Sequence, residues 1–402
     1  MKKHQIVAGL DIGTRAIKMA VAKVSQETGV LELMGVAQEA SAGMRKGVVV
    51  KPEETSKKIA SLARKMEQIS GERISEVFLT LGGSRVCALP SHGLIAVSRA
   101  DSHISQEDVD RVLQAAQAFS LSQNQEVLNV FPRQFSVDGD KGIKEPIGLR
   151  AVRLEADVLA VCVFSPDMRN LTQAVMDAGL EIADIVPAPL ACAASVLDDQ
   201  QKEMGVAVLD LGAGTTGISV FEEGDLVHLA VLPVGGENIT FDIGIGLKTD
   251  HETAERIKIE FGTCVAPKSR KMEKITLLNG EEFVFSPKLV SDIIEARAKE
   301  IFQLFVKELK KAGLRSQLPG GVVLCGGGAK LSKIAEYAKK ELKLPVRVGV
   351  PQGLLALETD PSFLPALGLL VGGEDFEGAR SGSSPFGKIL SSFRKMLQSF
   401  LP

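Results

Sequence analysis

The stretch AVLDLGAGTTGISV (residues 207–220) has a near copy earlier in the chain, AGLDIGTRAIKMAV (residues 8–21). Each begins as an apolar run, reaches Asp-x-Gly with a Thr close behind, and continues with alternating apolar residues. This pattern predicts a strand, a tight turn and a second strand, with Asp11 and Asp210 at the heads of two equivalent turns. The sequence therefore predicts two related halves.

Turns of this kind have the chemistry to bind a nucleotide's phosphates. Glycine allows close approach of the backbone, while backbone N–H groups and a Thr hydroxyl supply donors for an anion. An Asp at the head of each turn can hold a hydrated Mg²⁺. A single Asp-x-Gly turn is also common in ordinary hairpins, so the prediction of a two-sided phosphate site depends on the duplication. Because G-x-x-x-x-G-K-[ST] is absent, the site is not a P-loop.

A third segment, VVLCGGGAKL (residues 322–331), predicts a buried strand, three consecutive glycines and a helix. Consecutive glycines let the backbone lie flat against a nucleoside, although a triple glycine before a helix is also frequent in loops with no ligand.

Together the three segments resemble the phosphate and adenosine turns of the actin, Hsp70 and hexokinase superfamily. The resemblance implies an α/β fold, the actin-like duplicated two-lobe ATPase fold, which binds ATP with Mg²⁺. AERIK (residues 254–258) resembles the helix that touches adenine and ribose, here through Glu255 and Lys258; without the family, an exposed helical ion pair is an equal alternative. The residues implied for the nucleotide are Asp11, Gly13, Thr14, Arg15, Lys18, Asp210, Gly212, Gly214, Thr215, Thr216, Gly235, Gly236, Glu255, Lys258, Gly326, Gly327 and Gly328. Those implied for Mg²⁺, through water, are Asp11 and Asp210.

Within that superfamily nearly the whole chain resembles the bacterial cell-division family FtsA. The resemblance is carried by residues 82–119, 129–158 and 178–197 and by LPVGGENITFDIGIGL (residues 232–247). It implies an inserted α+β subdomain, 1C, that makes contacts between neighbours in a filament. The expected division is subdomain 1A at 1–84 and 166–198, the 1C insert at 85–165, subdomain 2A at 199–245 and 316–373 (the latter with a return to 1A), subdomain 2B at 246–315, a flexible linker at 374–385 and an amphipathic helix at 386–402.

One position departs from the family pattern. Actin-like ATPases usually place a Glu or Gln that polarises the attacking water in the segment that begins here as VPAPLACAASVL (residues 186–197). This chain has Ala188 where many FtsA chains have Glu, and no acid or amide elsewhere in the segment. A missing general base typically costs about 10²–10⁴-fold in rate. The sequence predicts ATP binding with slow hydrolysis and assigns no catalytic residue.

The C-terminal stretch SPFGKILSSFRKMLQSFLP (residues 384–402) separates into an apolar and a basic polar arc when placed on a helix. Such a helix is too short to cross a bilayer but suits its interface. A helix docked on the body is the alternative. The residues expected to meet an anionic membrane are Phe386, Ile389, Leu390, Phe393, Arg394, Lys395, Leu397, Phe400 and Leu401.

The family resemblance also implies partners and a role. FtsA tethers filaments of the tubulin-like FtsZ to the cytoplasmic membrane at the division septum, polymerises, and docks other division proteins. It holds FtsZ's C-terminal peptide in subdomain 2B, where Arg297 is the candidate for an acidic peptide; an ordinary surface charge is the alternative. A PilM-like platform for pilus assembly shares the fold and a similar insert but would not need the C-terminal helix. A sugar or acid kinase would need a catalytic Asp that we do not find, and an Hsp70 would need a further peptide-binding domain.

Composition and charge indicate the partners and the cellular compartment of the protein. The 402 residues carry a net charge of -3 at pH 7, which argues against nucleic acid as a partner of the whole surface. Residues 378–402 carry +4, so the remainder carries -7 and a basic tail follows an acidic body. Five scattered cysteines and the absence of a signal peptide predict a cytosolic body. The C-terminal helix and the family resemblance imply a peripheral position on the cytoplasmic face of the plasma membrane, at the division site.

Overall fold

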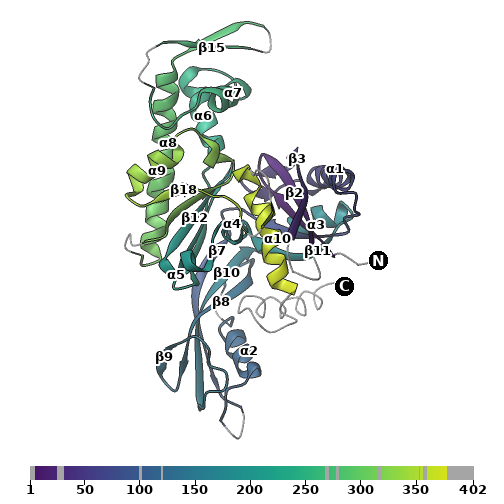
Figure 1. Ribbon diagram of the computed structural model, residues 1–402, viewed down its shortest axis with the longest axis vertical. Coiled ribbons are helices and arrows are strands. Elements are labelled where there is room, and N and C mark those ends of the chain that lie inside the picture. The colour runs from purple at the N-terminus through teal and green to yellow at the C-terminus, as the bar shows by residue number, and fades with distance from the viewer. Residues whose placement is uncertain are drawn as a thin grey trace.

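Two mixed β-sheets form the body of the molecule, and helices α4 (Ala188–Val196) and α10 (Leu364–Glu377) lie between them (Figure 1). The computed structural model describes residues 5–24, 31–98, 102–118, 121–267, 271–277, 280–314, 318–352, 354–355 and 360–377. The expected amphipathic helix at 386–402 and most of the expected linker lie outside these residues. Helix α10 runs to Glu377, four residues beyond the expected end of the body at 373.

The first sheet has six strands in the order β11-β6-β1-β2-β3-β19. Their bounds are β1 (Gln5–Ile12), β2 (Ala16–Val24), β3 (Leu31–Ala40), β6 (Glu76–Leu81), β11 (Glu181–Pro187) and β19 (Leu354–Leu355). Helix α1 (Pro52–Ser70) packs on β2 and β3 beside α3 (Ser165–Asp177), while α10 packs against β1, β2 and β6. A short hairpin of β4 (Met44–Arg45) and β5 (Val48–Val49) stands apart from this sheet.

The second sheet has nine strands in the order β18-β17-β12-β13-β14-β7-β10-β8-β9. Its first part consists of β12 (Val206–Leu211), β13 (Thr216–Glu222), β14 (Asp225–Leu232), β17 (Gly321–Cys325) and β18 (Val346–Val348). Its second part consists of β7 (Cys87–Ala96), β8 (Gln125–Val137), β9 (Asp140–Ile143) and β10 (Arg153–Phe164).

The strand order confirms the predicted duplication. In the first sheet β3, β2, β1, β6 and β11 follow one another with two antiparallel and then two parallel pairings. In the second sheet β14, β13, β12, β17 and β18 repeat that order and those directions. The two Asp-headed hairpins therefore occupy equivalent places in their sheets.

The insert interrupts one lobe in sequence and continues the sheet of the other. It interrupts the first lobe, but its sheet continues the sheet of the second lobe, because Ala230 of β14 pairs with Cys87 of β7. Helix α2 (Gln106–Ala115) covers one face of the insert and begins with a capping box formed by Ser105 and Asp108. The insert thus extends the second sheet away from the first (Figure 1).

A helical region caps the other end of the second sheet (Figure 1). It contains α6 (Gly236–Leu247), α7 (His251–Phe261), α8 (Pro287–Lys311) and a hairpin of β15 (Glu273–Thr276) with β16 (Glu282–Phe285). The remaining helices are α5 (Asp199–Met204), α9 (Ile334–Leu342) and the 3-10 turns η1 (Gly327–Lys330) and η2 (Pro361–Phe363).

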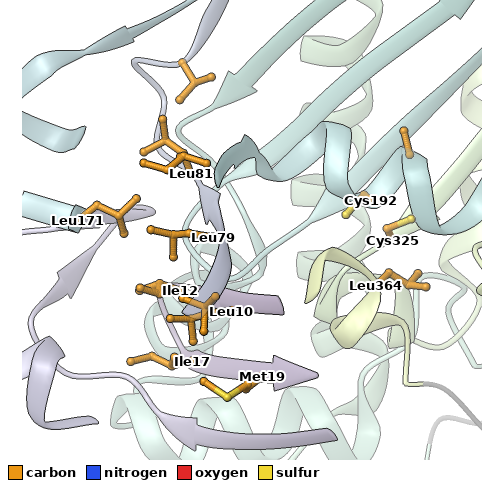
Figure 2. Close-up of a cluster of buried hydrophobic side chains, with 14 of the residues drawn as sticks. Leu10, Ile12, Ile17, Met19, Leu79, Leu81, Leu171, Cys192, Cys325 and Leu364 are labelled. Atoms are coloured by element: carbon orange, nitrogen blue, oxygen red, sulfur yellow. The ribbon is translucent and has the colours of Figure 1, made fainter. Parts of the chain in front are cut away.

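One apolar core connects the two lobes. In the first lobe it includes the fully buried Leu10, Ile17 and Met19 of the β1–β2 hairpin (Figure 2). The same cluster reaches Cys192 on α4, Cys325 on β17 and Leu364 on α10. The two Asp-headed hairpins therefore extend from a shared packed base.

Candidate functional site

Asp11, the residue before the end of β1, is almost fully buried, 7% exposed. Its Oδ1 accepts a hydrogen bond from Thr80 Oγ1 at 2.7 Å, and its Oδ2 lies 3.5 Å from Lys18 Nζ across the hairpin. Two fixed partners hold the carboxylate at the head of the first turn. Gly13, within the turn, donates its N–H to the Ala16 carbonyl at 3.2 Å.

Asp210 occupies the equivalent place in the second hairpin, where it pairs with Gly217 as Asp11 pairs with Lys18. Burial, and then the nearby charge of Asp11, raises the pKa of Asp210 to about 7. The thiol of Cys192 on α4 donates a hydrogen bond that partly offsets this rise in the pKa. Because the pKa of Asp210 lies near neutral pH, a cation bound beside it would favour its ionised form.

The two turns meet in the structure. A Cβ on Gly214 would lie 2.7 Å from Thr14 Oγ1 and 3.0 Å from Lys46 Cα, so only glycine fits at this contact. Thr14 belongs to the first lobe and Gly214 to the second. The geometry that the duplicated motif predicts, two turns facing each other, is therefore present.

The start of α6 supports the second turn from behind. Gly236 and Glu237 donate their N–H groups to the carbonyls of Gly212 and Ala213 at 2.9 and 2.8 Å. Gly235 lies directly against the turn, where a Cβ would come 2.8 Å from Thr215 N. The buried Thr216 hydroxyl donates to the Val234 carbonyl at 2.8 Å, so in this structure it holds the turn in place.

Glu255 and Lys258 form a buried cluster on α7 rather than an exposed pair. Lys258 Nζ donates to Glu255 Oε2 at 2.6 Å, to Thr240 Oγ1 at 2.7 Å and to the Gly236 carbonyl at 3.1 Å. Burial opposes the ionised form of Glu255, but hydrogen bonds donated by Lys258 and by the Thr240 hydroxyl hold its pKa below the usual range. Burial lowers the pKa of Lys258. Arg15 of the first turn completes the cluster from the other lobe, with Nη1 2.9 Å from Glu255 Oε1.

The triple glycine follows β17 as predicted, and a 3-10 turn precedes the expected helix. Gly326 has φ +77° and lies so close to Asp210 that a Cβ would collide with Oδ1. Gly327 is exposed with open space where a Cβ would point, and Gly328 packs on Leu211 of β12. The glycines therefore bring a third backbone segment to Asp210 and leave an open surface at Gly327.

Helix α4 begins at Ala188 against the second hairpin, since a Cβ on Gly217 of β13 would lie 2.7 Å from Pro189 Cγ. No Glu or Gln stands on α4, in agreement with the sequence.

Arg297 lies on α8, where it is already paired. Its Nε and Nη2 donate to Asp242 of α6 at 2.7 and 2.9 Å, and its Nη1 pairs with Glu300. Asp242 raises the pKa of Arg297. Beside this pair, α6 exposes Phe241 and Ile245, at 51% and 77%.

Several residues at the site were not predicted. They are Thr80, Cys192, Thr240 and the Lys46–Gly47 turn, and each contacts a predicted residue from another element of the fold. Only Lys46–Gly47 had a local signal, a glycine within a short polar stretch between apolar residues, MRKGVVV (residues 44–50).

A separate cavity of about 560 Å³ lies between the insert and the β13–β14 hairpin, with lining residues that include His92, Asp157, Lys144 and Asp225.

Within the part of the chain that the structure covers, no helix is both long and apolar enough to span a membrane. The same described residues hold no group of three or more His, Cys, Asp or Glu side chains placed to bind a metal.

Two copies of one mixed sheet, joined by a common core and meeting at paired Asp-headed turns, define the actin-like fold. Solved structures agree with this class. A chain of a PilM–PilN type IV pilus biogenesis complex is similar with a TM-score of 0.66 and 17% identity, covering 92% of this chain and 98% of that one. MreB5 of Spiroplasma citri bound to ADP is similar with a TM-score of 0.57 and 14% identity, covering 94% and 99%. At such identities these matches show the fold alone.

The chain belongs to the FtsA family of cell-division proteins. It is 35% identical over 379 residues to cell division protein FtsA of Pseudomonas aeruginosa, covering 93% of this chain and 90% of that one. It is 34% identical to FtsA of Bacillus subtilis, covering 92% and 84%. The family model for cell division protein FtsA matches residues 207–368, and that for the SHS2 domain inserted in FtsA matches residues 83–162.

Proposed function

We propose that this protein is an actin-like, ATP-binding cell-division protein that polymerises and tethers FtsZ filaments to the cytoplasmic membrane at the septum. Membership of the FtsA family carries the proposal. The meeting of the two turns at Thr14 and Gly214 supports its nucleotide-binding part. The subdomain limits given by the sequence are part of the same proposal.

The nucleotide is ATP with Mg²⁺, held between the lobes. Asp11 and Asp210 hold the metal through water, and a bound Mg²⁺ would offset the repulsion between the two carboxylates. The backbone and Thr14 of the first turn and Gly212, Gly214 and Thr215 of the second bind phosphate oxygens. The open surface at Gly327 receives the nucleoside, and the Glu255–Lys258 cluster lies toward its ribose.

Hydrolysis is slow in this proposal. Helix α4 brings Ala188 and no acid or amide to the second turn, so the chain lacks the usual group to orient and activate the water. The protein would then act mainly as a nucleotide-dependent polymer and tether. A single-turnover rate close to that of a Glu-bearing relative would contradict this part.

The tail supplies the membrane contact. Its large apolar residues each contribute about 1.5–3 kcal/mol when fully buried, but an interface buries them only in part. One tail therefore binds reversibly. Filament formation would join many tails and raise avidity by about 10²–10⁴ without new contacts. The basic residues of the tail favour an anionic, cytoplasmic lipid surface.

The ion pairs of Arg297 between α6 and α8 change how it could bind the FtsZ peptide. Because Asp242 and Glu300 already balance its charge, Arg297 is not a free cation for an acidic peptide. The exposed Phe241 and Ile245 lie on α6 beside Asp242, the partner of Arg297, and offer an apolar surface there. We propose that the peptide's apolar residues bind there and that its acidic residues compete with Asp242 for Arg297.

Self-association and other division proteins complete the proposal. The insert carries the filament contacts, and the cavity between the insert and the β13–β14 hairpin is one surface on which other division proteins can dock. Nucleic acid is not among the proposed partners.

The test is co-sedimentation of the full chain with anionic liposomes, ATP and FtsZ, compared with a chain truncated after Pro385. The proposal predicts that the full chain carries FtsZ down and that the truncated chain leaves it in solution. Sedimentation of the full chain without FtsZ would favour a PilM-like platform. If neither chain binds liposomes, the membrane part of the proposal is wrong.

A further inference from the structure

Two cysteines face each other where the insert joins the body. Cys87 begins β7 and Cys162 lies near the end of β10, which are the first and last strands of the insert. The two residues are direct partners in the antiparallel pairing of these strands. Residues paired in this way have their side chains on the same face of the sheet, with Cβ atoms about 4.5–5.5 Å apart. The pairing therefore brings together two thiols that are distant in sequence.

Contacts of Arg85 hold the two strands at this point. Arg85 precedes β7, and its Nε donates a hydrogen bond to Asp167 Oδ2 at 2.8 Å. Its guanidinium carbon lies 4.0 Å from the centre of the Phe164 ring, at the end of β10. These contacts connect the chain that enters the insert to the chain that leaves it, so they keep Cys87 opposite Cys162.

The two thiols differ in their access to solvent. Cys87 is half-buried, whereas Cys162 is fully buried in the apolar cluster beneath α2. Burial raises the pKa of Cys87, and burial together with the nearby Cys87 raises the pKa of Cys162 to about 11. Both groups are therefore neutral thiols at pH 7, and a reagent from solvent meets Cys87 first.

The other three cysteines are closed to solvent. Cys192 and Cys325 also lie next to each other, in the core that connects the lobes (Figure 2), but both are fully buried. Cys264 is fully buried in the core of the second lobe, away from the other four. A reagent from solvent reaches these three thiols only when their cores open.

We propose that Cys87 and Cys162 are a modification site, which a small disulfide such as oxidised glutathione converts to a reversible disulfide bond. The bond cross-links the first and last strands of the insert. Because Cys87 also pairs with Ala230 of β14, the cross-link lies at the junction of the insert with the second lobe. In a reducing cytosol the pair stays reduced, and the bond forms when small disulfides accumulate. The inference does not depend on the proposed binding of nucleotide, membrane or FtsZ.

The bond forms by two exchange steps. The thiolate of Cys87 attacks one sulfur of oxidised glutathione, which releases one reduced glutathione and leaves a mixed disulfide on Cys87. The thiolate of Cys162 then attacks the Cys87 sulfur and releases the second glutathione. The two protein thiols are oxidised, one glutathione disulfide is reduced, and the two protons pass to the released glutathione thiolates. Since a relaxed disulfide prefers Cβ atoms about 3.5–4.5 Å apart, a bond across paired strands is strained and reduced glutathione can reverse it.

The first test incubates the full chain with oxidised glutathione at pH 8, blocks the remaining thiols after denaturation and maps linked peptides without reductant. The five free thiols should fall to three, with a link between Cys87 and Cys162, and reduced glutathione should restore all five. Cys162→Ala should stop at a mixed disulfide on Cys87. Cys264→Ala, the matched control, removes a cysteine outside the pair and should leave the link unchanged. A mixed disulfide that persists in the wild type, a link between Cys192 and Cys325 instead, or no loss of thiols would overturn the inference.

The second test measures hydrogen–deuterium exchange in β7 and β10 of the reduced and the oxidised chain at low denaturant. Because a disulfide limits separation of the strands, oxidation should slow exchange there by about tenfold or more. Exchange in α8 should not change. Cys87→Ser treated with oxidised glutathione should show no slowing in β10. Slowing that persists in this variant, or equal exchange in the reduced and oxidised wild type, would show that the bond does not cross-link the insert as proposed.

Discussion

At the residue scale, the two aspartates are equivalent in sequence and different in surroundings. Asp11 has an ion-pair partner across its own hairpin and a hydroxyl donor from β6. Asp210 faces a thiol and the charge of Asp11, and its pKa rises to about 7. The Asp-x-Gly pattern predicts both carboxylates but not this difference, because Thr80 and Cys192 come from other elements and belong to no local motif.

The raised pKa has a consequence for stability that Asp210→Asn can test. A carboxyl group whose pKa is raised on folding contributes stability that is fully present below its ordinary pKa and is lost as pH rises through about 7. At pH 8 without nucleotide the variant should therefore be more stable than the wild type, by roughly 1–3 kcal/mol, and this advantage should shrink toward pH 5.

Urea unfolding at pH 5, 6.5 and 8 measures the effect. Asp199→Asn, at a fully exposed carboxylate, is the control and should shift stability little at any pH. A destabilised Asp210→Asn at pH 8 would show that the carboxylate is better accommodated than its burial implies. With Mg²⁺ and ATP the order should reverse, because only the wild type gains from the metal.

At the element scale, the sequence predicts structure well where the signals are local. Ile59, Leu62, Ala63 and Met66 form the buried face of α1 as their spacing predicts, and the α2 capping box is present. The β4–β5 hairpin escaped prediction because its strands are too short to show alternation and its turn is Lys-Gly rather than Asn-Gly.

The glycine turn after β17 offers a matched pair of substitutions. Gly326→Ala combines a left-handed backbone with a collision against Asp210, so it should lower the free energy of unfolding by more than about 1–2 kcal/mol. Gly327→Ala enters open space and should change stability by about 0.5 kcal/mol or less. Denaturant titration of both variants without nucleotide checks the contrast, and equal effects would contradict the assigned geometry.

Helix α4 provides a test of the missing base. Ala188→Glu places a carboxylate at the start of this helix, beside the second turn, and should raise the single-turnover rate of ATP hydrolysis by about tenfold or more. Ala188→Met adds similar bulk without a base and should not. An unchanged rate in Ala188→Glu, with ATP affinity retained, would show that another feature limits hydrolysis.

At the scale of the whole molecule, the doubled motif predicted the two-lobe fold, while the attachment of the insert could not be predicted. Pairing between Cys87 and Ala230 joins strands far apart in sequence, and no local pattern encodes such a contact. The C-terminal helix stays a prediction, since residues 378–402 lie outside the described ranges.

Because the insert and the second lobe share one sheet, we expect their strands to have similar free energies of local unfolding. Because β7 and β10 continue the sheet of β13 and β14, their amides should open together in native-state hydrogen exchange, with similar free energies across rising denaturant. The amides of α2, on the outer face of the insert, serve as the comparison and should open at lower free energy. Separate, earlier opening of β10 would show that the insert is an independent unit.

Helix α10 has a consequence for synthesis. It closes the first lobe, with Leu367 and Leu370 buried against strands made more than 300 residues earlier, and Gly9 touches its backbone. On the ribosome, the apolar surface of β1 and β2 that α10 covers must therefore wait until that helix emerges, while the strands of the insert and second lobe can already pair. The first lobe is therefore the first to be synthesised, but its core is the last to be completed.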